Sequence, residues 1–170
     1  MPRKPFIEPS APILRLKPPA GREWVHEVKH DGWRGQLHKA GDDVVVYSKT
    51  GADFTKRFRS IAATVLKLPV TSCILDVELD GTPHIMAPLE YRRHLLGKLL
   101  KRAKSDTLRM SENFRDPIAL LKAAETHGLE GIVSKLREDR YRSGKNPGWI
   151  KVKTAAWRAA NRERYKLFEK

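Results

Sequence analysis

The sequence is poor in cysteine, in long apolar runs and in acidic residues. Its single cysteine, Cys73, cannot form an internal disulfide, which excludes a disulfide-stapled scaffold and suits a reducing compartment. No window approaches the roughly 18 consecutive apolar residues of a membrane span, and the N-terminal region lacks the apolar block of a signal peptide. We therefore expect a cytoplasmic protein, associated with the nucleoid if bacterial, without a membrane partner.

Acidic residues are few relative to basic ones. Lys and Arg number 34 against 20 Asp and Glu, a formal net charge of +14. The excess is uneven, since residues 1–85 carry a net of +3 and residues 86–170 a net of +11. Such an excess favours a polyanionic partner, and nucleic acid is favoured over membrane because no lipidation motif is present. A solvated basic surface is the alternative.

At 170 residues and 40% hydrophobic composition, we expect a single domain over residues 1–170. Its Pro-rich opening, residues 1–23, is expected to be extended, and residues 154–170 to form a basic helix packed through Trp157, Tyr165 and Phe168. The remaining pattern predicts strands and helices between these segments. The expected strands are 24–29, 34–39, 43–48, 72–79, 132–135 and 149–153, and the expected helices begin near Asp53, Leu89 and Pro117.

The first three strands read as an antiparallel meander, and the helix after them is expected to be capped by Asp53 or Thr55 and to end at Pro69. Asp116, Pro117 and Gly128 bound the last of the three helices, as cap, first residue and stop. Strands come in a run before helices intersperse, which predicts an α+β fold with mainly antiparallel sheets flanked by helices.

The segment from Glu27 to Arg34 contains a lysine, Lys29, between a strand and an Asp-Gly turn. A lysine in this position can project its amine into a cleft, and Arg34 can return to the same site. Attack on a phosphate would require Lys29 to lose its proton, which desolvation or neighbouring cations promote. A surface lysine before an ordinary turn is the alternative.

Lysines also cluster near the end of the chain. Lys151 and Lys153 share one face of an expected strand because side chains alternate, and Lys135 lies on an expected neighbouring strand. Ammonium groups on one face repel unless an anion neutralises them, so the set is suited to phosphate. A solvated basic strand face is the alternative. Core packing is favoured for Trp33, Trp149 and Trp157, and stacking on bases is the alternative.

Seven motifs follow one another in a specific order: KHDGWR, YSKTGADFT, ILDVELDG, PLEYRRHLL, GLEGIVSK, the Tyr141-x-Ser143-Gly144 loop and WIKVK. In this order they resemble the ATP-dependent DNA ligases, and in particular the bacterial non-homologous end-joining type, from about Trp24 to the C-terminus. The resemblance implies a minimal ligase-type nucleotidyltransferase (ATP-grasp-like) fold. It also implies an enzyme that acts in DNA repair on nicked or broken duplex DNA.

The resemblance assigns the nucleophile to Lys29, which would attack the α-phosphate of ATP and hold AMP before AMP passes to a DNA 5′-phosphate. Mg²⁺ would neutralise the triphosphate. Nucleotide contacts would come from Glu27, Lys29, Arg34, Lys49, Glu78, Lys135, Lys151 and Lys153, and metal contacts from Glu78 and Glu130. Lys49 stands where related sequences often have Arg.

The sequence departs from the family at two internal places. Where the family has Asp-Gly-Glu, this chain has Asp76-Val77-Glu78. Only Leu79–Ala87 separate this motif from the Pro-Leu helix, where the family has several tens of residues, including an aromatic that stacks on adenine. We also expect no OB-fold domain after WIKVK, so that a partner protein would supply its function. A catalytically impaired module that binds DNA or nucleotide is the alternative function, and RNA ligases or capping enzymes are a third.

Overall fold

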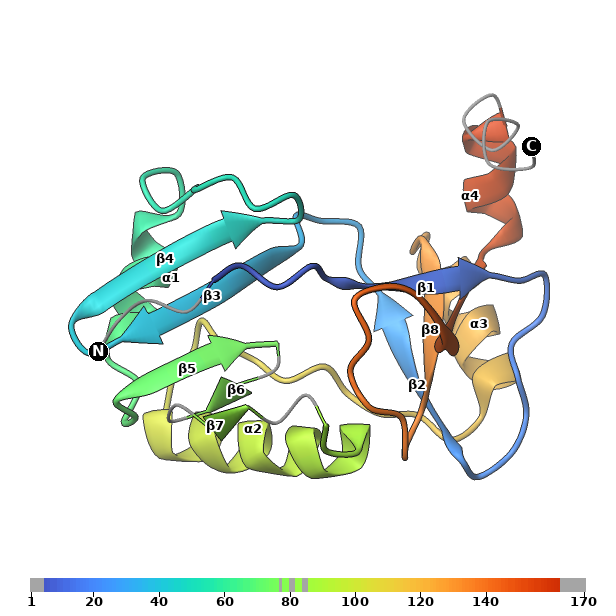
Figure 1. Cartoon of the computed structure of the whole chain (residues 1–170). Helices are drawn as coiled ribbons and strands as arrows, with labels where there is room; N and C mark the ends of the chain where they lie inside the picture. The colour runs from blue at the N-terminus through green and yellow to red at the C-terminus, as the bar shows by residue number, and fades with distance from the viewer. Residues whose placement is uncertain (1–4, 77, 80–81, 84–85, 163–170) are drawn as a thin grey trace. The chain divides into compact units, whose positions relative to one another are not determined.

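The structure is a computed structural model that describes residues 5–76, 78–79, 82–83 and 86–162 (Figure 1). The chain divides into two compact units, each assembled from three separate stretches of sequence. Unit 1 comprises Met1–Ser10, Trp33–Met110 and Glu138–Gly144, and unit 2 comprises Ala11–Gly32, Ser111–Arg137 and Lys145–Lys170. Each unit contains its own sheet and its own hydrophobic cluster.

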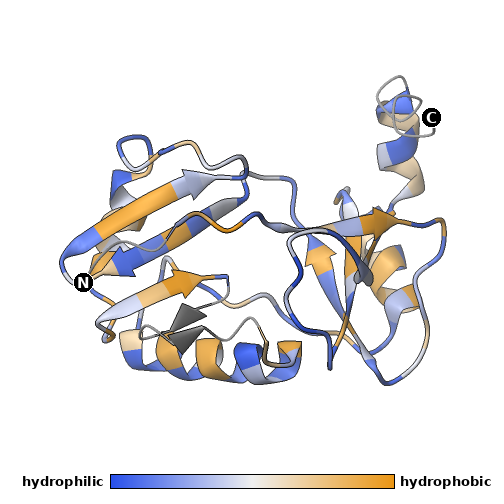
Figure 2. Cartoon of the chain, in the orientation of Figure 1, coloured by the Kyte–Doolittle hydropathy of each residue, from blue (hydrophilic) through white to orange (hydrophobic). Residues whose placement is uncertain are grey.

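Unit 1 is built on a five-stranded antiparallel sheet with the order β4-β3-β5-β6-β7. Its strands are β3 (Gly35–Ala40), β4 (Asp43–Ser48), β5 (Ser72–Leu75), β6 (Glu78–Leu79) and β7 (Thr82–Pro83), and its helices are α1 (Arg59–Leu66) and α2 (Leu89–Ala103). Val65 of α1 and Leu99 of α2 pack with Cys73 of β5 in one buried cluster. Apolar and polar residues alternate along α2 (Figure 2), as expected for a helix with one buried side.

The N-terminal segment of unit 1 is bound to the sheet through side-chain amides. Gln36 is almost fully buried, and its amide accepts from the Ile7 N–H at 3.2 Å and donates to the Ile7 carbonyl at 3.0 Å. His38 lies 2.7 Å from the same Gln36 oxygen. Ile7 also packs against Ile74 and Tyr141. These contacts satisfy polar groups that would otherwise be costly to bury.

Unit 2 contains a four-stranded sheet with the order β1-β9-β8-β2. Its strands are β1 (Ser10–Leu14), β2 (Trp24–Lys29), β8 (Gly131–Leu136) and β9 (Gly144–Lys153), and its helices are α3 (Pro117–Thr126) and α4 (Ala155–Ala160). Strand β8 pairs antiparallel with both β2 and β9. Ile132 and Val152 of the sheet pack with Leu120 and Ala124 of α3 to form the core.

Several predicted elements are confirmed, and α3 shows why. The carboxylate of Asp116 accepts from the N–H groups of Ile118 and Ala119, each at 2.9 Å, and Pro117 occupies the first turn. Gly128 follows the helix with φ of +66°, the left-handed conformation that commonly ends helices. The strands at 24–29 and 43–48 and the helix from Leu89 are also confirmed.

The helix predicted from Asp53 begins later, at Arg59, and its expected side-chain cap is wrong. Phe58 occupies the N-cap without a side-chain hydrogen bond. The Thr55 hydroxyl instead accepts from the Val46 N–H at 3.0 Å. Asp53 accepts from the Thr55 N–H at 2.8 Å. Both candidate caps are therefore used to fold the loop against β4 rather than to start α1.

The meander and the strand at 72–79 also require correction. Strand β2 pairs with β8 in unit 2, whereas β3 and β4 form a hairpin in unit 1. The 72–79 segment turns back on itself, so that β5 and β6 pair with each other. The Pro-rich opening includes a short strand, β1, and α4 forms the start of the predicted C-terminal helix; Tyr165 and Phe168 lie outside the described residues.

The predicted α+β class with mainly antiparallel sheets flanked by helices is confirmed. Among the helices of the described ranges, none has the length and apolar character needed to cross a bilayer.

Candidate active site

The strand register of unit 2 places the predicted lysines of β2, β8 and β9 on one face of the sheet. Directly paired residues share a face because side chains alternate along each strand. Three rows result: Lys29–Gly131–Lys153, Glu27–Val133–Lys151 and Val25–Lys135–Trp149. The alternate positions, including Ile132 and Val152, form the core beneath α3. One face is thus apolar and structural, and the other carries the charged groups.

Glu130 joins Lys29 and Lys153 at one end of this face. Its two carboxylate oxygens form separate ion pairs, one with the Lys29 ammonium and one with the Lys153 ammonium. The Glu130 side chain is only 5% exposed, and that of Lys29 is 25% exposed. A carboxylate shared by two cations in a nearly buried position leaves excess positive charge, because two ammonium groups face one acid.

A second ion pair lies further along the face. The Lys135 ammonium donates to Glu27 at 2.6 Å, and it lies 4.5 Å from the centre of the Trp149 ring. Lys153 similarly lies over the ring of Trp157 of α4, at 3.7 Å. Aromatic faces attract cations, so Trp149 and Trp157 hold the two lysines in defined positions. Trp149 is buried and Trp157 half-buried, which indicates a packing role for both.

The environment of Lys29 acts on its pKa in opposing directions. Burial lowers the pKa of the Lys29 ammonium, and the negative charge of Asp31 offsets part of that effect. The ion pair with Glu130 also favours the charged form. The Lys29 ammonium therefore loses its proton most readily when Glu130 is drawn towards another cation.

Two residues that sequence reasoning did not single out position Glu130. Gly131 has φ of +153°, and a Cβ there would lie 2.0 Å from the Val152 carbonyl oxygen, so only glycine fits between β8 and β9. Thr154 donates from its N–H to the Glu130 carbonyl at 3.1 Å and from its hydroxyl to the Leu129 carbonyl at 3.0 Å. In the sequence, the Glu-Gly pair of the GLEGIVSK motif could have indicated the importance of Gly131. No sequence pattern indicated a role for Thr154.

Arg34, Lys49 and Glu78 are the predicted site residues of unit 1. Arg34 and Lys49 flank the paired residues Gly35 and Ser48, so they lie at the same end of the β3–β4 hairpin. Lys49 is exposed. The backbone of Glu78 pairs with Ile74, but its side chain lies outside what the structure describes.

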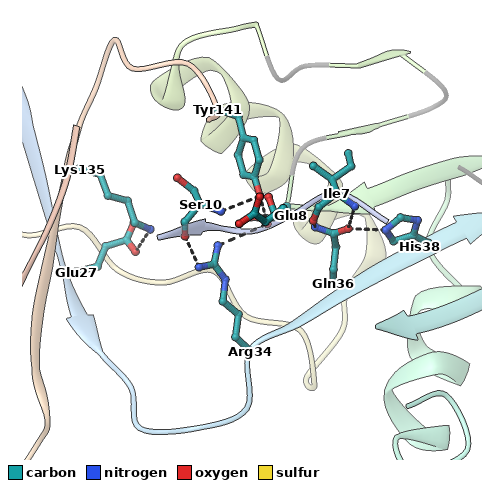
Figure 3. A network of polar contacts seen from close by, with 10 residues as sticks. Ile7, Glu8, Ser10, Glu27, Arg34, Gln36, His38, Lys135 and Tyr141 are labelled. Carbon is teal, nitrogen blue, oxygen red and sulfur yellow. Dashed lines mark hydrogen bonds and ion pairs between the residues drawn. The ribbon is translucent and has the colours of Figure 1, made fainter. Parts of the chain in front are cut away.

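Tyr141 organises the surroundings of Arg34 in unit 1 (Figure 3). The Arg34 guanidinium donates to the Ser10 carbonyl and lies 3.7 Å from the Asp76 carboxylate. The Tyr141 hydroxyl accepts from the Ser10 N–H at 3.1 Å and lies 3.0 Å from the Glu8 carbonyl and 3.1 Å from Asp76. Burial, reinforced by Asp76, raises the pKa of Tyr141, so it remains a neutral hydrogen-bonding group. The motif order included Tyr141 but gave no indication of these partners.

The donor set suits Mg²⁺ bound largely by substrate. Within the described ranges, no group of three or more His, Cys, Asp and Glu side chains forms a metal-binding cluster. Two nearly buried carboxylates lie at the lysine cluster, Glu27 paired with Lys135 and Glu130 shared by Lys29 and Lys153. Mg²⁺ commonly takes one or two carboxylates together with phosphate oxygens, so Glu130 fits a metal that enters with a nucleotide.

Comparison with known sequences gives the family. The family model described as "ATP dependent DNA ligase domain" matches residues 14–80 and 78–153. The chain is 29% identical to the multifunctional non-homologous end joining protein LigD of Pseudomonas aeruginosa, over 89% of this chain and 22% of that protein. It is 33% identical to a probable DNA ligase of Sorangium cellulosum, over 91% of this chain and 37% of that protein. The chain thus spans less than two-fifths of these relatives.

A solved structure supports the same fold. The mycobacterial DNA ligase D complexed with ATP and MES aligns with a TM-score of 0.68 and 22% identity, over 86% of this chain and 60% of that one.

The family match breaks at residues 78–80, where the motif spacing predicts missing sequence. The alignment with the Pseudomonas protein extends over 189 positions, whereas 89% of the 170 residues is about 151 residues. About 38 aligned positions therefore have no residue in this chain. With most of the chain matched on both sides of this break, the chain belongs to the ATP-dependent DNA ligase domain family.

Proposed function

We propose that this chain is the adenylation domain of a DNA-joining enzyme and forms a covalent AMP adduct on Lys29. The observation that carries the proposal is the contact of Lys29 and Lys153 with Glu130 on the charged face of the unit 2 sheet. Membership of the ligase family supports the reaction class. The ATP bound to the mycobacterial relative supports ATP as the nucleotide.

In the proposed step, the neutral Lys29 amine attacks the α-phosphorus of ATP. A phosphorus–nitrogen bond forms, the bond from the α-phosphorus to the bridging oxygen breaks, and pyrophosphate leaves with its electron pair. The amine gives up a proton to solvent or to a neighbouring carboxylate. Burial of Lys29 favours the neutral amine that this step needs.

The surrounding charges suit an anionic ligand. If all are ionised, Lys29, Lys135, Lys151 and Lys153 against Glu27 and Glu130 give the face a net charge of +2. The phosphates of a bound nucleotide would replace the two carboxylates as partners of these ammonium groups. The resulting hydrogen bonds would be charge-assisted, and such bonds are stronger than neutral ones. We assign phosphate contact to Lys135, Lys151 and Lys153.

The remaining assignments follow the resemblance. Glu27 would lie near the base, and Arg34, Lys49 and Glu78 would also contact the nucleotide. Mg²⁺, held by Glu130 with Glu78, would neutralise the triphosphate and stabilise the leaving pyrophosphate. Drawing Glu130 away from Lys29 would also remove the ion pair that keeps the lysine protonated.

We further propose that AMP passes to the 5′-phosphate of nicked or broken duplex DNA, in double-strand break repair. The name of the Pseudomonas relative supports an end-joining role. The net charge of +14 supports a nucleic-acid substrate.

The test is incubation of the purified chain with Mg²⁺ and ATP labelled at the α-phosphate, followed by denaturing electrophoresis. Label should remain on the wild-type protein and be lost in Lys29→Ala and Lys29→Arg, since the arginine variant keeps the charge without a nucleophile at neutral pH. Lys122→Ala, an exposed lysine of α3 in the same unit, should label like wild type. Absence of label on a folded wild-type protein that still binds DNA would refute the enzymatic proposal in favour of a binding module.

A further inference from the structure

Trp33 is an exposed aromatic held in a fixed place in unit 1. It is 67% exposed, so the expected core packing is wrong for this residue, whereas Trp149 in unit 2 is 7% exposed. Its ring lies 5.6 Å from that of Phe54, and the Arg57 guanidinium lies 4.7 Å from its centre. Phe58 continues the row, 6.3 Å from Phe54. With two-thirds of its surface facing solvent, the indole can accept a further flat group.

The loop that supports Trp33 is tied to strand β4. The Phe54 N–H donates to the Val46 carbonyl at 2.7 Å, and the Thr55 hydroxyl accepts from the Val46 N–H at 3.0 Å. The Arg57 N–H donates to the Phe54 carbonyl at 2.9 Å. Phe54 and Arg57 are thus positioned before any ligand arrives, which lowers the entropy lost on binding.

The surroundings of the ring are basic. Three exposed cations follow one another closely in the sequence, Lys56, Arg57 and Arg59, with Phe58 between the last two. The acidic residue of the same loop is Asp53. Aromatic rings combined with Lys and Arg are the combination that binds single-stranded nucleic acid, because bases stack on the rings and phosphates meet the cations. A purely apolar partner would gain nothing from three exposed cations.

We propose that Trp33, Phe54, Lys56, Arg57 and Arg59, here called the Trp33 patch, bind an unpaired nucleotide at a DNA end. The base stacks on the open face of Trp33, and the three cations contact the flanking phosphates. This inference rests on the proposed function in taking DNA as the substrate. The inference goes beyond the proposed function by predicting a preference for DNA ends that carry a single-stranded overhang.

The preference can be measured by fluorescence anisotropy with a blunt duplex and with the same duplex carrying a short single-stranded overhang. Wild-type protein should bind the overhang duplex more tightly. Trp33→Ala should weaken that binding roughly 5- to 150-fold, the range for loss of one stacked base, and leave blunt-duplex binding nearly unchanged. Trp33→Phe, which keeps an aromatic face and the fold, should retain part of the preference.

Matched controls come from helix α2 of the same unit. Tyr91→Ala removes an aromatic that is 50% exposed, and Lys101→Gln removes an exposed cation. Tyr91→Ala should keep the overhang preference. Lys101→Gln should change the affinity for the two duplexes by the same factor, whereas Arg57→Gln should weaken binding of the overhang duplex more than binding of the blunt duplex.

A direct readout uses wild-type protein and 2-aminopurine in the overhang, whose fluorescence falls when it stacks on an indole. Equal wild-type affinity for both duplexes, or unchanged quenching in Trp33→Phe and Trp33→Ala, would overturn the inference. An overhang preference lost in Trp33→Ala without an AMP adduct on wild type would refute the proposed function and leave this inference standing. An AMP adduct on the wild type without a preference for the overhang duplex would support the proposed function and refute this inference.

Discussion

Substitution of Gly131 by alanine tests how closely β8 and β9 approach at the proposed nucleophile. The added Cβ would lie 2.0 Å from the Val152 carbonyl oxygen and 2.9 Å from the Lys153 Cα, whereas ordinary contact begins near 3.4 Å. The β9 backbone would have to move by about 1.4 Å, and alanine would have to adopt φ of +153°. Strained backbone costs about 1–3 kcal/mol, and two weakened ladder hydrogen bonds cost about 0.5–1.5 kcal/mol each. These costs together give an expected loss of about 2–6 kcal/mol.

Urea unfolding followed by tryptophan fluorescence measures this loss, because Trp24, Trp149 and Trp157 all belong to unit 2. Two glycines of the same unit supply controls. Gly128→Ala meets no atom within 4 Å but has φ of +66°, so it should cost about 1–2 kcal/mol. Gly32→Ala meets no atom within 4 Å and has no such φ, so it should change stability by less than about 0.5 kcal/mol. If Gly131→Ala destabilises no more than Gly128→Ala, the close approach of the strands is wrong.

Three further predictions concern other groups of the two units. Asp116→Ala should cost about 1 kcal/mol of unfolding free energy in urea because α3 loses its cap, and Asp116→Asn should cost less. Burial, and secondarily Arg137, lowers the pKa of His26. As pH falls below about 6.5, the unfolded chain binds a proton before the folded chain does, so the free energy of unfolding should fall between pH 7.5 and pH 5.5. This fall should be smaller in His26→Gln than in the wild type. Tyr141→Phe removes the hydroxyl that accepts from Ser10 and should speed amide hydrogen exchange at Ile7, Glu8 and Ser10, with a stability loss of about 1–2 kcal/mol; unchanged exchange would contradict the anchoring role.

Local patterns in the sequence predicted much of the fold. Asp116, Pro117 and Gly128 defined a helix because capping and termination act over a few neighbouring residues. Alternation placed Lys151 and Lys153 on one strand face. The order of motifs gave the family. In each case the deciding interactions lie within about ten residues, or the information is the linear order itself.

Tertiary structure decided which strands share a sheet and which charges meet. Nothing local distinguishes β2 from β3, yet β2 pairs with β8 more than a hundred positions away, and only that register sets Lys29 in line with Gly131 and Lys153. The Tyr141 hydrogen bonds to Ser10 also join distant segments. The sequence by itself determined the family and the candidate nucleophile; the fold decided that Glu130 lies between two lysines, because long-range strand pairing depends on the burial of whole faces and leaves no local pattern.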